Sequence, residues 1–132
     1  MAHFEKEFLL FLAELEVNNN RDWFNANKER FKSKVEEPFI QYIDHLIPLA
    51  RKQGASIRGN GKDCVFRIYR DVRFSKDKSP YKLHMAAFLG HEGKKDFDHP
   101  GFYIEFTADM LRVYSGLYQP EKDLLEIGRA HV

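Results

Sequence analysis

The hydrophobic periodicity of the chain changes near Gly54, and this change constrains the fold more than any other feature. Before Gly54 the apolar residues recur at helical spacing, whereas after it they alternate with polar residues as in half-buried strands. No linker or low-complexity run separates the two parts. We therefore expect a single α+β domain in which helices pack on an antiparallel sheet.

Three helices are expected in the N-terminal part. The first carries an apolar stripe from Phe4 to Leu15 and ends at the asparagines of residues 18–20, which cap helices well. The second begins near Arg21. Because proline is costly inside a helix, we expect a break before Pro38 and a third helix from there to about residue 53.

About four strands are expected in the second part. They cover residues 64–74, 81–89, 102–107 and 110–114, and a further helix is expected to begin at Glu121. The strand at 64–74 is predicted from alternation, since Phe66, Ile68, Val72 and Phe74 would share one face. Residues 75–80 are expected to form a loop.

Residues 66–82, called the basic segment below, concentrate the positive charge of the protein. They hold six Lys and Arg residues and two Asp residues, a local charge of +4, whereas the whole chain has +1. Arg and Lys side chains bind phosphate and carboxylate groups, and a Ser-containing turn adds further donors. A solvated charged loop is the alternative interpretation, because exposed ion pairs contribute little.

Arg70 falls in register with the apolar residues of the predicted strand, so its guanidinium would point inward. An unpaired buried charge is costly. We expect it to pair with an acid such as Asp22, Glu37 or Asp71, or to meet backbone carbonyls, a bulge or a bound anion. These alternatives are compatible if an acid holds the side chain beside a pocket.

Composition excludes several classes of function. The 132 residues suit one domain, the single cysteine, Cys64, has no partner for an internal disulfide, and a net charge of +1 argues against a general nucleic-acid binder. No apolar run is long enough to span a bilayer, and the N-terminus does not resemble a signal peptide, so we expect a cytoplasmic location and no membrane partner. The common phosphate-loop, nucleophile and dinucleotide motifs are missing, and no cofactor is expected.

The histidines and acids between His84 and His99 do not have a spacing that specifies metal ligands. We therefore expect no metal site there.

Five short stretches together resemble the domain-of-unknown-function 2461 family. They are Asn19–Phe24, Asn27-Lys28, the basic segment, Gly101–Tyr103 and Gly116–Tyr118. The resemblance extends over residues 4–127 and implies a cytosolic α+β protein without specifying a reaction. Residues 128–132 depart from the family pattern, and we interpret them as an artefactual tail. Residues 1–127 would then be a C-terminally truncated part of a longer family domain.

The basic segment and the start of the second helix provide the candidate site. The expected ligand-binding residues are Arg67, Arg70, Arg73, Lys76, Lys78, Ser79, Tyr81, Lys82, Asn20 and Asn27. Asp71 is the candidate orienting group or catalytic base. We expect a small ligand that carries phosphate or carboxylate; a module that docks an acidic partner or RNA, or a purely structural Arg/Asp network, are the alternatives.

Overall fold

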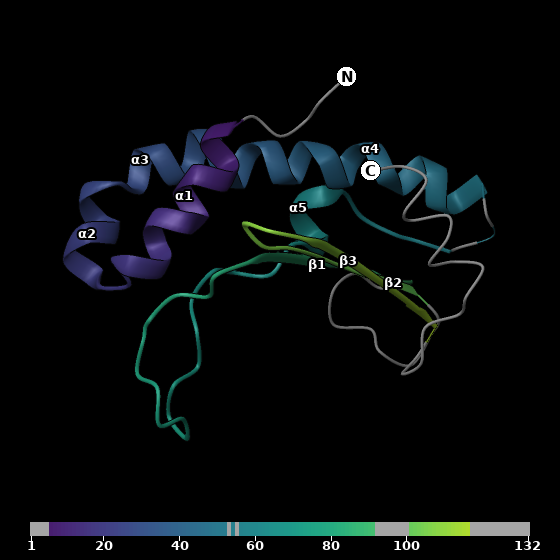
Figure 1. Cartoon of the computed structure of the whole chain (residues 1–132). Coiled ribbons are helices and arrows are strands. Elements are labelled where there is room, and N and C mark those ends of the chain that lie inside the picture. The colour runs from purple at the N-terminus through teal and green to yellow at the C-terminus, as the bar shows by residue number, and fades with distance from the viewer. Residues whose placement is uncertain (1–5, 53, 55, 92–100, 117–132) are drawn as a thin grey trace.

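Helices in the first half of the chain cover one face of a three-stranded antiparallel sheet with strand order β1-β2-β3 (Figure 1). The computed structural model describes residues 6–52, 54, 56–91 and 101–116. The elements are α1 (Lys6–Val17), α2 (Arg21–Ala26), α3 (Lys28–Phe31), η1 (Lys32–Glu36), α4 (Glu37–Lys52), α5 (Gly61–Cys64), β1 (Met85–Leu89), β2 (Gly101–Phe106) and β3 (Leu111–Gly116). The α+β class is confirmed, with one regular strand fewer than expected.

Phenylalanine fills the core between the helices and the sheet. Phe8, Phe11 and Phe39 are fully buried, and the Phe11 ring lies 5.6 Å from the ring of Phe31. Burial of such a side chain stabilises the fold by about 1.5–3 kcal/mol. Alternate residues of β1, Met85, Ala87 and Leu89, face the same core, so the amphipathic stripe of α1 and the sheet share one apolar layer.

The turn between α1 and α2 is formed by the asparagines, as their capping preference predicted. The side-chain oxygen of Asn20 accepts a hydrogen bond from the Trp23 N–H at 2.8 Å and so caps α2. Asn18 caps the preceding end through its side-chain N–H, which donates to the Glu14 carbonyl at 2.9 Å. The two helices are therefore joined with very few residues.

The expected break before Pro38 was wrong, because α3, η1 and α4 form one continuous helical run. η1 is a π-helical turn, in which the Glu37 N–H donates to the Lys32 carbonyl five residues back. A proline lacks the N–H that a regular helix needs and crowds the carbonyl four residues before it. The wider turn directly before Pro38 accommodates both defects.

The expected strand at residues 64–74 was also wrong. Residues Gly61–Cys64 form α5, and a capping box between Asn60 and Asp63 stabilises its N-terminal end. Beyond it, Val65 and Tyr69 form isolated bridges with Ala87 and Tyr81, and no strand follows. The apolar residues at the end of this stretch do not pack on the core, since the Phe74 side chain is 94% exposed.

The three strands of the sheet lie close to their expected positions. The strand expected at 81–89 is regular only from Met85, and the other two are β2 and β3, which pair antiparallel with Ile104 opposite Val113. Thr107 and Met110 close the turn between them through a 2.9 Å backbone hydrogen bond. The helix expected from Glu121 and the tail at residues 128–132 lie outside the described residues.

Candidate anion-binding site

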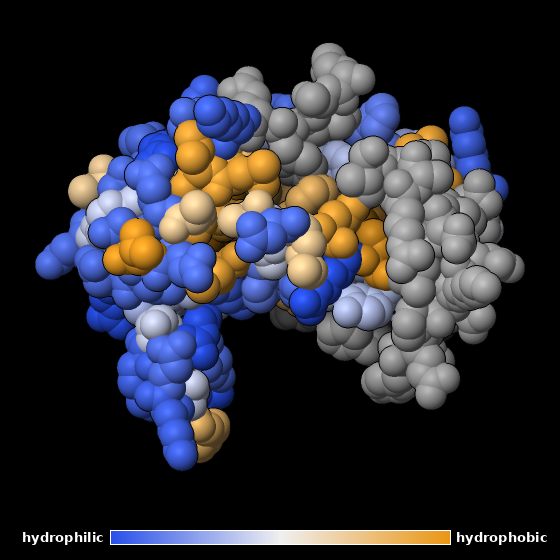
Figure 2. All heavy atoms as spheres, viewed as in Figure 1, coloured by the Kyte–Doolittle hydropathy of each residue, from blue (hydrophilic) through white to orange (hydrophobic). Residues whose placement is uncertain are grey.

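The basic segment leaves the body of the protein as a projecting loop with two arms (Figure 1). The arms are joined at their base, where the Arg70 N–H donates to the Pro80 carbonyl at 2.9 Å and the Lys82 N–H donates to the Ile68 carbonyl at 2.7 Å. The surface of this projection is mainly hydrophilic (Figure 2). Its charges therefore stand away from the apolar core, and only its base contacts the helices.

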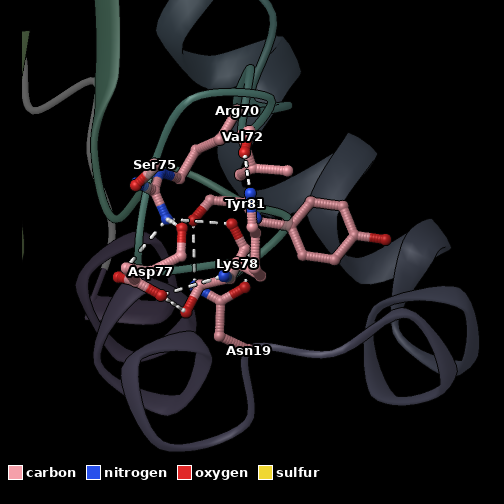
Figure 3. A network of polar contacts seen from close by, with 8 residues as sticks. Asn19, Arg70, Val72, Ser75, Asp77, Lys78 and Tyr81 are labelled. Carbon is pink, nitrogen blue, oxygen red and sulfur yellow. Dashed lines mark hydrogen bonds and ion pairs between the residues drawn. The ribbon is translucent and has the colours of Figure 1, made fainter.

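Arg70 holds the two arms together from the inside of the loop (Figure 3). Its guanidinium donates to the Ser79 carbonyl at 3.0 Å and lies 3.3 Å from the carboxylate of Asp77. The expected pairing with Asp22, Glu37 or Asp71 was wrong, because the acid comes from the loop itself. The alternative of backbone carbonyls is confirmed, and Arg70 acts as a brace rather than as a core residue.

Other polar contacts stiffen the same loop. The Lys78 ammonium donates to the Val72 carbonyl at 2.6 Å, and the carboxylate of Asp77 accepts hydrogen bonds from the hydroxyl and the N–H of Ser79. These bonds from Ser79, with a smaller contribution from Arg70, lower the pKa of Asp77. The loop is therefore a cross-linked unit despite its lack of regular secondary structure.

The turn between α1 and α2 is fastened to the base of the loop. The side-chain N–H of Asn19 donates to the Tyr81 carbonyl at 2.9 Å, and the Tyr81 N–H donates back to the side-chain oxygen at 3.1 Å (Figure 3). The ring of Tyr81 stacks on Phe24 of α2 with centroids 4.1 Å apart. These contacts fix the position of α2 relative to the two arms.

A surface hollow of about 890 Å³, called the basic hollow below, lies between α2 and the loop. It is lined by Asn19, Asn20, Arg21, Asp22, Asn25, Arg67, Tyr69, Arg70, Val72, Lys78, Pro80 and Tyr81. Four of these residues are cations, and Asp22 is the single acid among them. The positive charge of the lining suits an anion.

The basic hollow contains some of the residues expected at the site. Asn20, Arg67, Arg70, Lys78 and Tyr81 belong to its lining. The role of each in ligand binding stays a prediction.

The remaining expected residues do not line the hollow. They are Asn27, Asp71, Arg73, Lys76, Ser79 and Lys82. Of the three cations Arg70, Arg73 and Lys82, only Arg70 therefore belongs to the lining.

Asp71 and Arg73 pair with each other on the outside of the loop. The Arg73 guanidinium donates to the Asp71 carboxylate at 3.0 and 2.8 Å, and both side chains are exposed. This pairing lowers the pKa of Asp71. A carboxylate with a lowered pKa is a weak base, so this geometry does not favour the catalytic role considered for Asp71.

The side chains of Lys82 and Asn27 donate hydrogen bonds to backbone carbonyls. The Lys82 ammonium donates to the Arg67 carbonyl at 2.8 Å, and the side-chain N–H of Asn27 donates to the Trp23 carbonyl at 2.8 Å. Both contacts support local structure. Lys76 is exposed on the loop.

Sequence reasoning missed Arg21 and Asn25 as lining residues. Both belong to α2: Arg21 lies in the Asn19–Phe24 stretch and Asn25 directly follows it, but the sequence does not show which of these side chains face the loop. Tyr69, which is not among the expected ligand-binding residues, also lines the hollow and is 45% exposed. Its ring lies 5.0 Å from the guanidinium carbon of Arg67, which places a cation beside an exposed aromatic surface.

A second polar cluster lies on the face of the sheet opposite the helices. The Tyr103 hydroxyl donates to Glu105 at 2.9 Å, and His84 and Arg112 approach the same carboxylate at 3.7 and 3.9 Å. Burial, followed by the hydrogen bond to Glu105, raises the pKa of Tyr103. Within residues 6–52, 54, 56–91 and 101–116, no group of three His, Cys, Asp or Glu side chains is placed to hold a metal ion.

In the described part of the chain, no helix has both the length and the apolar character needed to cross a membrane.

The fold and the site together define an α+β domain with a basic surface hollow beside a braced, projecting loop. A family model described as "Conserved hypothetical protein (DUF2461)" matches residues 7–132. The chain belongs to this family, as its motifs predicted. Comparison with curated proteins and with solved structures gives no match.

Proposed function

We propose that the protein binds a small phosphate- or carboxylate-bearing ligand in the basic hollow, with Arg21 and Arg67 as the anion-binding side chains. The observation that carries the proposal is that both line the hollow while neither forms an ion pair with any described residue. A guanidinium presents a planar fork of donors that matches both oxyanions. Arg21 comes from α2 and Arg67 from the loop, so a ligand would be held from two sides.

The other cations of the lining have a different role. Arg70 and Lys78 spend donors on the carbonyls of Ser79 and Val72, so they maintain the shape of the loop. They add positive charge to the hollow without being free to reorient. This division between supporting and binding groups is the arrangement that a preorganised site requires.

The proposal is one of binding and assigns no reaction. Asp71, the candidate base, lies outside the lining and is paired with Arg73. Asp22 is the acid within the lining, and we assign it to hydrogen bonding with the uncharged part of a ligand. Its negative charge would also repel ligands that carry several negative charges throughout the hollow.

Isothermal titration with inorganic phosphate, ribose 5-phosphate and malonate tests the proposal. We expect Arg67→Met and Arg21→Met each to weaken binding by about tenfold, the loss of a charge-assisted contact. Arg73→Met is the matched control, because it removes the same charge from the same loop outside the hollow. Circular dichroism confirms that each variant is folded.

Two results would contradict the proposal. One is the failure of every probe to bind the unaltered protein. The other is an equal loss of affinity in Arg67→Met and Arg73→Met, which would indicate binding to the general charge of the loop. Such non-selective binding would also weaken steeply with added salt.

A further inference from the structure

We infer that the ligand of the basic hollow is a nucleotide unit, that is, a phosphate joined through a sugar to a base. The inference rests on the proposed function and adds the class of the ligand. Its starting point is that the hollow combines cations with an exposed aromatic ring, whereas a site for a bare anion needs the cations alone. Tyr69 is that ring.

The position of Tyr69 suits stacking with a flat group. Its ring packs against Tyr81 and Phe24, with centroids 5.6 and 6.3 Å away, and these contacts hold it in place. The guanidinium carbon of Arg67, the anion-binding group from the loop, lies 5.0 Å from the ring centroid, so the place for a phosphate and the place for a stacked base adjoin each other. Aromatic rings are a common surface on which proteins stack nucleobases.

The remaining lining groups fit the rest of a nucleotide. Asn25 and Asp22 supply donors and acceptors of the kind that sugar hydroxyls and base edges need. Arg21 lies on the same helix and would meet the phosphate. A base on Tyr69 and a phosphate near Arg21 would therefore bridge the loop and α2.

The size of the hollow supports a ligand larger than a single oxyanion. Its volume of about 890 Å³ falls within the range of roughly 300–1,000 Å³ that is usual for small-molecule pockets. A phosphate alone would leave most of that space to water. A nucleotide, or the terminal nucleotide of a single strand, would also cover Pro80 and Val72 at the loop side.

A ligand series tests the inference on the unaltered protein. Isothermal titration compares a nucleoside monophosphate, the matching nucleoside, ribose 5-phosphate and inorganic phosphate. We expect the monophosphate to bind about tenfold or more tightly than ribose 5-phosphate, since a stacked base adds affinity. A 5′-phosphorylated single-stranded oligonucleotide forms an additional arm that distinguishes a free nucleotide from a chain end.

Two substitutions at Tyr69 locate the effect. Tyr69→Leu keeps apolar volume and removes the ring, so it should abolish the advantage of the monophosphate over ribose 5-phosphate. Tyr69→Phe keeps the ring and should preserve most of that advantage. If Tyr69→Leu does not fold, the ligand series on the unaltered protein still decides the question.

Each outcome has a definite meaning. A base-dependent gain that Tyr69→Leu removes supports the inference, whether the mononucleotide or the oligonucleotide binds. Equal affinity for ribose 5-phosphate and the monophosphate would overturn the inference and leave the proposed function standing. No binding of any anion would overturn both.

Discussion

The side chain of Asn19 pairs with the backbone of Tyr81 much as a neighbouring strand would. It donates to the carbonyl at 2.9 Å and accepts from the N–H at 3.1 Å, across a sequence separation of 62 residues. The contact satisfies both backbone groups of Tyr81 at a point where no regular strand is present. It is also a direct polar link between the α1–α2 turn and the loop base.

Asn19→Ala should therefore destabilise the protein by about 1–3 kcal/mol, since two partly buried backbone groups lose their partner. Urea unfolding measures this loss. Asn18→Ala is the matched control, because the Asn18 side chain donates only to the Glu14 carbonyl of its own helix end among the contacts described. We expect less than about 1 kcal/mol for the control, and equal losses would show that the link to Tyr81 has no special weight.

Arg70→Met should loosen the projecting loop while leaving the helices intact. The substitution removes the donors to the Ser79 carbonyl and the ion pair with Asp77. Hydrogen exchange should become faster in residues 71–79 and stay unchanged in α4. Arg73→Met removes an exposed pair instead, and it should leave exchange in the loop nearly unaltered. Similar exchange in both variants would contradict the bracing role of Arg70.

Gly61→Ala should destabilise the fold, although alanine is the better helix former. A Cβ at this position would lie 2.5 Å from the Ile40 carbonyl oxygen and 2.9 Å from the Asp44 carboxylate. Relieving this overlap would require α5 to move away from α4, at a cost of about 1–3 kcal/mol. Lys62→Ala on the exposed side of the same turn should change stability by less than about 0.5 kcal/mol. Thermal unfolding of both variants checks this difference.

His84 should make the protein less stable as the pH falls below neutrality. Burial lowers its pKa from the ordinary value near 6.5, and the positive charges of Lys82 and Arg112 add to this effect against the opposing charge of Glu105. The unfolded chain therefore binds a proton at a higher pH than the folded protein does. The contribution of neutral His84 to the free energy of unfolding is fully present above the pKa of the unfolded chain. It declines as the pH falls through that value toward the pKa of the folded protein.

The measurement compares urea midpoints at about pH 7.5 and pH 5.5. The unaltered protein should lose more stability over this interval than His84→Gln, which has no titrating group at the position. A control at pH 7.5 records the cost of the substitution itself. Identical losses in the two proteins would show that His84 does not cause the pH dependence.

Features governed by nearby residues were predictable from the sequence. The stripe of α1, the capping by Asn20 and the turn at Thr107–Met110 depend on contacts within a few positions. Gly54 was also recognised as the end of a helix, and it has a φ of +97°, which glycine adopts easily. At these positions the structure preferred by the local sequence is the structure that the fold contains.

Features that depend on distant partners were not predictable. The alternation of residues 64–74 indicated a strand, but it could not show that the chain moves away from the sheet after Tyr69. Pro38 indicated a break in the helix. The sequence does not show the π-helical turn that accommodates the proline ring. Arg70 was recognised as needing partners, yet these lie up to nine residues further along the same loop.

Only part of the lining of the basic hollow could be predicted, because the lining depends on contacts between distant parts of the chain. The local charge of the basic segment is visible in the sequence, and Arg67 and Lys78 from the expected set line the hollow, while their role in binding stays a prediction. Which cations turn into the hollow and which bond to backbone depends on the fold of the loop. Arg21 and Asn25 could be recognised only after α2 was placed beside Tyr69.

The Asn19–Tyr81 link has a consequence for how the hollow comes into existence. Because its two walls are separated by some 62 positions in the chain, a synthetic peptide of the basic segment would carry most of the charge and none of the cavity. Closing so long a stretch costs entropy, so these walls should meet late in folding. A partly folded chain would then expose a flexible internal segment of positive charge, and selective ligand binding would appear only after these long-range contacts have formed.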